Sequence, residues 1–113
     1  MKLSIYEFKG LRRVYTIIEL QDREKNLLNY LSSLGEEELM EVMTKVFGKL
    51  RVLKYGKGAL VGDEKVGYMF IELELEDYSI YTLEVYPAAI TLIADSSFSD
   101  LKTKASRLVN LIS

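Results

Sequence analysis

The chain has 113 residues, a formal net charge of −2 and a pI near 5.2. This length predicts one domain with a sizeable core, and 49% hydrophobic with 28% charged residues is typical of a folded chain rather than a disordered one. The slightly negative net charge argues against a protein whose whole surface binds polyanions. No apolar run approaches a membrane span and residues 1–4 are unlike a signal peptide, so we expect a cytoplasmic protein.

Cysteine and histidine are both missing from the sequence. This excludes disulfides, thiolate nucleophiles, imidazole bases and the commonest zinc ligands. We therefore expect no cofactor and no catalytic site of the common kinds. The few Asn and Gln residues, with many Glu and Lys, match the composition of thermophilic proteins.

Two strands are predicted at the start, over residues 2–8 and 13–20, because apolar and polar residues alternate in both. Lys9 and Gly10 would form the turn between them. Two helices should follow. Asp22 is placed to cap the first helix, which should end at Gly35. The apolar residues of this helix have helical spacing. These positions are Leu27, Leu28, Leu31 and Leu34.

The second helix has the clearer start signal. Ser33 and Glu36 have the spacing of a capping box, and the helix should end near Gly48. Shorter strands are expected at 50–55 and 59–61, separated by a turn at 55–59 that lacks the spacing of a phosphate-binding loop. The strand at 59–61 would pair with one beginning at Val66, through a turn at 62–65.

The strongest strand signals lie in residues 66–95. Apolar residues at 69, 71, 73 and 75 alternate with glutamates, and a second alternating run follows at 79–86. We expect a hairpin with Leu75 opposite Tyr81 and a turn at 77–79, which would place Glu72 opposite Glu84. Pro87 predicts a bulge or the start of a new strand.

Residues 88–94 are apolar on nearly both faces, which is typical of a central strand that is covered on two sides. The protein's own helices would cover one side, and a partner subunit is a candidate for the other. After Ser97 or Ser99, a final helix is predicted from apolar residues at helical spacing. They are Leu101, Ala105, Leu108 and Ile112.

These elements predict a single α+β domain over residues 1–113. It has an antiparallel sheet of five to six strands with helices packed mainly on one face, in the order strand, strand, helix, helix, three or four strands, helix. This order resembles that of longin or Roadblock domains and of helix-grip lipid-binding domains. The resemblance concerns the order of elements alone and implies no functional residue.

Aromatic residues on the predicted non-core face form the first candidate site. Tyr68, Phe70 and Tyr86 lie there among charges, and Ile93 lies on the second face of residues 88–94. Exposed aromatic residues on one face indicate a contact surface, although tyrosines also occur in ordinary sheets.

The other candidates are charged. Glu72 and Glu84 would hold a metal ion or act as an acid–base pair, unless they only keep a strand face wet. A basic stretch is the candidate for an anion or nucleic-acid contact. Its residues are Lys49, Arg51, Lys54, Tyr55 and Lys57. In the simpler reading, Lys45 and Lys49 complement the end of a helix.

Our leading hypothesis is a non-catalytic protein–protein interaction module that self-associates. One alternative is a small apolar-ligand binder, with a cavity between the sheet and the C-terminal helix near Met69, Tyr81 and Leu108. Another is a metal-dependent enzyme that uses Glu72 and Glu84. A second copy or another protein is the expected partner, whereas nucleic acid and membrane are not expected.

Overall fold

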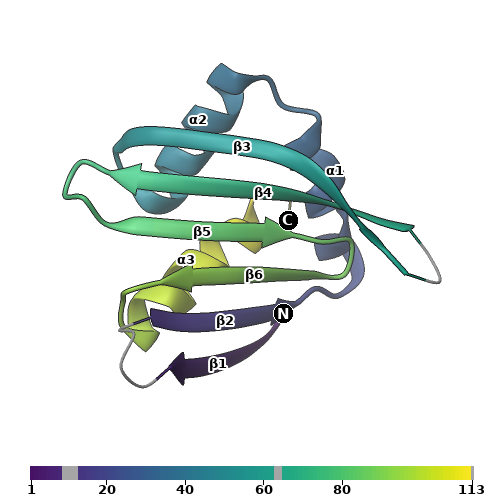
Figure 1. The fold of residues 1–113 in the computed structure, drawn as a ribbon, viewed down its shortest axis with the longest axis horizontal. Coiled ribbons are helices and arrows are strands. Elements are labelled where there is room, and N and C mark those ends of the chain that lie inside the picture. Colours follow the sequence, from purple (N-terminus) through teal and green to yellow (C-terminus); the bar gives the residue numbers. More distant parts are fainter. Residues whose placement is uncertain (9–12, 63–64, 113) are drawn as a thin grey trace.

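A six-stranded antiparallel sheet is the central element of the computed structural model, which describes residues 1–8, 13–62 and 65–112 (Figure 1). The strands are β1 (Lys2–Phe8), β2 (Arg13–Glu19), β3 (Leu50–Val61), β4 (Lys65–Leu75), β5 (Ile80–Val85) and β6 (Ala89–Ala94). The helical segments are η1 (Asp22–Asn26), α1 (Leu27–Ser32), α2 (Glu36–Phe47) and α3 (Phe98–Asn110). The chain is an α+β domain of the predicted order.

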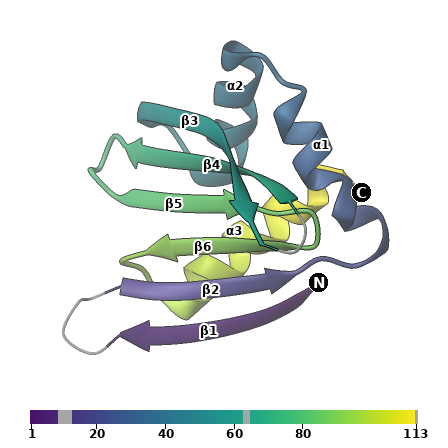
Figure 2. The same cartoon turned by 45° about the vertical axis from the view of Figure 1, so that its right-hand side comes forward.

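The strands lie in the order β1-β2-β6-β5-β4-β3, and each neighbouring pair is antiparallel. Within the described residues, β1 and β3 are therefore the two edges, and β6 is an inner strand, as its apolar sequence predicted. The helices α1, α2 and α3 lie on one side of the sheet, and no described residue forms a helix over the other side (Figures 1 and 2). None of these helices is long and apolar enough to cross a membrane.

The core lies between the sheet and the helices. On β4, Ile71 and Leu73 are fully buried whereas Phe70 and Glu72 are exposed, so the alternation in sequence is an alternation of faces. The largest fully buried side chains come from both layers, with the helices adding leucines and a methionine. These helical residues are Leu27, Leu31, Leu39, Met43 and Leu101.

Ser97 caps α3 as predicted, its hydroxyl accepting from the Asp100 N–H over 3.1 Å, but the starts of the other helices differ from those predicted. Asp22 is not a cap but the first residue of η1, with a φ of 51°, and the backbone N–H of Gln21 donates to Glu24 Oε1 over 3.0 Å. Gly35 precedes α2 without a side-chain cap, because the Ser33 hydroxyl donates instead to the Tyr30 carbonyl over 2.7 Å. Gly48 ends α2 as expected, with a φ of 110° that suits glycine.

The turn predicted at 55–59 is wrong, because β3 runs without a break from Leu50 to Val61. Gly56 and Gly58 lie within this strand, opposite Phe70 and Tyr68. A Cβ on Gly56 would lie 2.5 Å from Phe70 Cζ, and one on Gly58 would lie 2.7 Å from Tyr68 Cζ. The two rings thus occupy the space above the glycines, which explains how glycine is accommodated in the strand.

The register predicted between β4 and β5 is wrong by two residues. Leu73 pairs with Tyr81, so the turn falls one residue earlier than expected. The turn is a three-residue loop over residues 76–78, in which Tyr78 has a φ of 69°. Two bonds close it: Tyr78 N–H donates to the Leu75 carbonyl over 3.0 Å, and Leu75 N–H donates to the Ser79 carbonyl over 2.9 Å.

The remaining turns have mixed outcomes. Pro87 separates two strands, since β5 ends at Val85 and β6 begins at Ala89, with Tyr86 N–H donating to the Ala89 carbonyl over 2.8 Å. The expected turn at Lys9 and Gly10 lies outside the described residues, as does part of the turn at 62–65.

The β3–β4 hairpin extends past the rest of the sheet. β4 pairs with β5 only from Met69 onward, whereas its pairing with β3 continues to Lys65. Residues 59–61 and 65–67 therefore form a two-stranded projection, here called the arm. In Figure 2 the arm comes forward past the end of β5, on the side opposite the helices.

Candidate functional site

The side of the sheet that faces away from the helices is the candidate site, and is here called the open face. The strand registers place one side chain of each alternating pair on it, from every strand of the described sheet. Its main side chains are Tyr6, Tyr15, Ile17, Lys54, Tyr68, Phe70, Glu72, Ile80, Thr82, Glu84, Tyr86, Thr91 and Ile93. Aromatic and aliphatic groups are therefore mixed with charges on a surface that no helix covers.

The structure brings together three of the four residues expected at an interface. The rings of Tyr68 and Tyr86 stack, with centroids 5.2 Å apart and planes at 26°. Phe70 follows on the same face of β4 and is 42% exposed. Ile93 lies apart from them on β6, half-buried between Thr82 and Tyr15.

A hydrogen bond fixes the position of Tyr86. Its hydroxyl donates to Glu84 Oε2 on the same strand face. This bond to a carboxylate, with some burial, raises the pKa of Tyr86 to about 12. The Tyr86 ring is thereby held against Tyr68.

The two glutamates proposed as a metal pair are not opposite each other. Glu72 pairs with Thr82 and Lys54, whereas Glu84 pairs with Phe70 and accepts from Tyr86. The shift of two residues places Glu72 and Glu84 on a diagonal, where the separation is about 7–8 Å. Across the described part of the chain, no group of three or more acidic residues could hold a metal ion.

The basic stretch is not gathered into one surface. Along β3, Lys54 points to the open face, whereas Tyr55 and Lys57 alternate to the other side. Arg51 is engaged by its neighbours: Nη1 lies 3.7 Å from Glu74 Oε1, and its guanidinium carbon lies 4.9 Å from the centroid of the Tyr78 ring. Lys49 precedes the strand. On an edge strand, such charges discourage pairing with another sheet.

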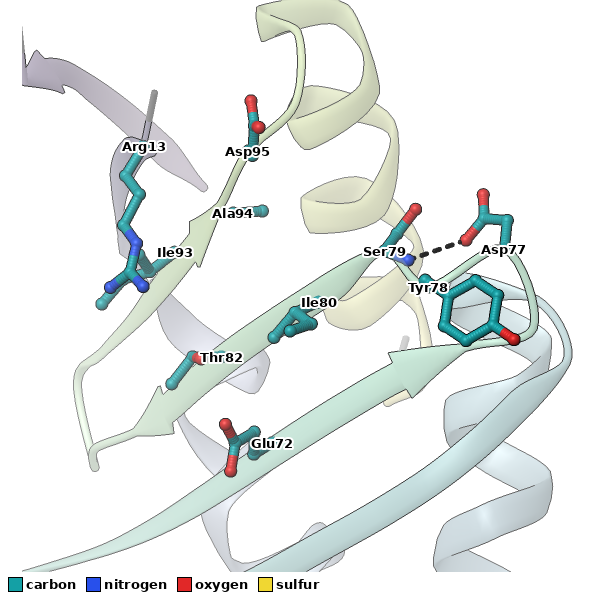
Figure 3. A pocket seen from close by; sticks show the side chains of 10 residues that line it. All are labelled: Arg13, Glu72, Asp77, Tyr78, Ser79, Ile80, Thr82, Ile93, Ala94 and Asp95. Carbon is teal, nitrogen blue, oxygen red and sulfur yellow. Dashed lines mark hydrogen bonds between the residues drawn. The ribbon is translucent and has the colours of Figure 1, made fainter. Parts of the chain in front are cut away.

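A hollow of about 590 Å³ lies on the open face, at the end of the sheet that carries the β4–β5 turn (Figure 3). Ile80, Thr82 and Ile93 form its floor, and Arg13 and Glu72 face each other across it. The Asp77 and Asp95 carboxylates and the Tyr78 ring complete its rim. A smaller hollow of about 210 Å³ adjoins it beside Val52 and Lys54.

Sequence reasoning missed most of this hollow. Ile80 gave a signal, because it is an apolar residue at a non-core position of an alternating strand, and it is 52% exposed. Arg13 and Asp95 gave none, since they are far apart in the chain and line the same hollow only because β2 pairs with β6.

The cavity expected between the sheet and α3 involves residues that are part of the continuous core. Met69, Tyr81 and Leu108 are buried, and the Tyr81 ring centroid lies 5.0 Å from that of Phe47. Both hollows described above lie on the opposite side of the sheet. Comparisons with models of protein families, with curated proteins and with solved structures give no match to this chain.

Proposed function

We propose that this protein is a non-catalytic interaction module that associates with a second copy of itself through the open face. The observation that carries this proposal is the exposure of large apolar groups on a sheet face with no helix over it. Tyr6, Phe70 and Ile80 are 53%, 42% and 52% exposed there. Apolar surface gathered on one face gains free energy when a partner removes it from water.

The composition of the face fits an interface with protein. Tyrosine combines a large ring with a polar tip, and it is enriched at interfaces. Lys54, Glu72 and Arg13 add charges of both signs, which allow a two-fold arrangement to place opposite charges across from each other. The sequence adds support, because it has no His or Cys for the common catalytic mechanisms.

The size of the face also bears on the proposal. Six strands about 4.8 Å apart, each about six residues long at about 3.3 Å per residue, give a flat area on the order of 500 Å². A standard interface buries about 800 Å² of accessible surface per partner. Side chains that project from the sheet make its accessible surface larger than this flat area. The open face can therefore supply most of such an interface.

The test is the mass of the protein by light scattering over a range of micromolar concentrations, with an Ile93→Lys variant beside the parent. We expect a parent dimer and a folded, monomeric variant, because the new ammonium group would be placed within the contact. Met40→Lys is the matched control, since Met40 is 43% exposed on α2, away from the sheet. A parent that remains monomeric, or a control that dissociates equally, contradicts the proposal.

A further inference from the structure

We infer that the arm of one copy docks into the hollow on the open face of the second copy, and that the two copies make this contact twice. This inference rests on the proposed self-association and adds which parts of the two copies meet.

The arm has a surface that needs a cover. Leu60 and Val61 are 51% and 86% exposed. The first part of β3 bears charges at Arg51, Lys54 and Lys57, but residues 58–61 have none. Natural sheets protect their edge strands with charged residues or with a covering element. The end of β3 has neither among the described residues, so a partner that covered it would supply the missing protection.

The hollow offers apolar side chains inside a charged rim at the other end of the sheet. Its floor includes Ile80, which is more than half exposed, and Ile93. The arm and the hollow are far apart within one chain: Val66 pairs with Leu60 and Glu74 pairs with Ile80, and these two positions on β4 are eight residues, or about 27 Å, apart. The arm therefore does not reach the hollow of its own chain.

Two-fold symmetry brings the two surfaces together. When two sheets pack face to face about an axis that is parallel to both and perpendicular to the strands, the strand direction is reversed in the partner. The arm end of each copy then lies over the hollow end of the other. Because the arm leaves the sheet on the open-face side, it projects toward the partner in this arrangement (Figure 2).

The area of the contact supports the same arrangement. The flat face alone is on the order of 500 Å², below the roughly 800 Å² per partner of a standard interface. Two arms in two hollows add contact on both sides and bury the exposed Leu60 and Ile80 side chains.

Cysteine crosslinking tests the contact cleanly, because the parent has no cysteine. A Leu60→Cys chain is mixed with an Ile80→Cys chain and oxidised mildly. We expect a mixed disulfide, formed about 10²-fold faster than by free encounter, because docked thiols meet at roughly millimolar effective concentration. Leu60→Cys mixed with Ile93→Cys is a second pair, because Ile93 also lines the hollow, and Met40→Cys on α2 is the control partner for Leu60→Cys.

The outcomes separate the inference from the proposed function. A dimer by light scattering in which neither arm pair crosslinks faster than the control pair overturns the docking of the arm and leaves self-association standing. A chain that is monomeric in the same measurement overturns both. A disulfide within one chain does not confuse the result, since the parent has no cysteine and each variant carries only one.

Discussion

The contact between β5 and the start of α3 gives the sharpest test of how this fold is held together. Tyr81 is 6% exposed, and its hydroxyl donates to Asp100 Oδ2 over 2.5 Å. The same oxygen accepts from Ser96 Oγ over 2.5 Å, and Lys104 Nζ lies 2.8 Å from Asp100 Oδ1. One carboxylate thus ties the helix to the sheet, and Tyr81→Phe removes a single bond from it.

The expected loss follows from the charge and burial of the partners. A hydrogen bond to a charged group contributes about 1.5–3 kcal/mol, and we take the lower end because the Asp100 side chain is 28% exposed and water replaces part of the bond. Tyr81→Phe should therefore lower the free energy of unfolding by about 1.5 kcal/mol. At about 4 °C per kcal/mol for a domain of this size, the Tm falls by about 6 °C.

Urea unfolding of four proteins measures this contact: the parent, Tyr81→Phe, Asp100→Ala and the double variant. Because both single changes remove the same bond, the double variant should lose about 1 kcal/mol less than the sum of the two. If the two losses add to within about 0.5 kcal/mol, the bond between Tyr81 and Asp100 does not stabilise the fold.

The same contact predicts a dependence on pH. Burial acts to raise the pKa of Asp100, but hydrogen bonds from Lys104, Ser96 and Tyr81 outweigh it and hold this pKa below the ordinary 3.8. Stability from Asp100 is therefore complete above pH 3.8 and is lost as the pH falls through the lowered pKa. Burial and then the bond to Asp100 raise the pKa of Tyr81 from 10.0 to about 12. The stability that Tyr81 contributes is complete below pH 10.0 and is lost as the pH rises to about 12. This pH dependence should be absent in Tyr81→Phe.

Three further changes test other parts of the structure. Thr16→Val should raise the free energy of unfolding by about 1 kcal/mol in urea, because Thr16 Oγ1 is buried and has no hydrogen-bond partner among the described residues; a loss would reveal such a partner. Phe70→Ala should cost about 0.5–1 kcal/mol in the same assay, since Phe70 covers Gly56 across the strands, and an unchanged stability would show that this cover is dispensable. Millimolar magnesium should leave the Tm unchanged, whereas a rise of several degrees would restore the metal hypothesis for Glu72 and Glu84.

The fold class followed from the sequence because alternation and helical spacing are strong in most elements. The register between β4 and β5 did not follow, since a shift of two residues keeps every side chain on its own face. What selects the register is the turn, where Tyr78 adopts a φ of 69° and Asp77 Oδ1 accepts from Ser79 N–H over 3.0 Å. A tyrosine in this conformation gives no glycine-like signal in the sequence.

The continuous strand β3 shows a second limit of local reasoning. Two glycines separated by one residue predict a turn when only their neighbours in sequence are considered. The strand persists because Tyr68 and Phe70, which belong to β4, place their rings over Gly58 and Gly56. The information that decides the structure of residues 56–58 therefore lies in a different strand, about ten residues along the chain.

The distribution of charge bears on which surface associates. If two copies paired antiparallel through the β3 edge, Arg51, Lys54 and Lys57 of one strand would approach the same residues of the other, and like charges across strands are destabilising. The open face instead carries Lys54 and Arg13 beside Glu72 and Glu84, so opposite charges are available to both copies. Edge pairing is therefore opposed along most of β3 and unopposed only at the arm. This contrast favours association through the face, with the arm as the one part of the edge that is free to take part in it.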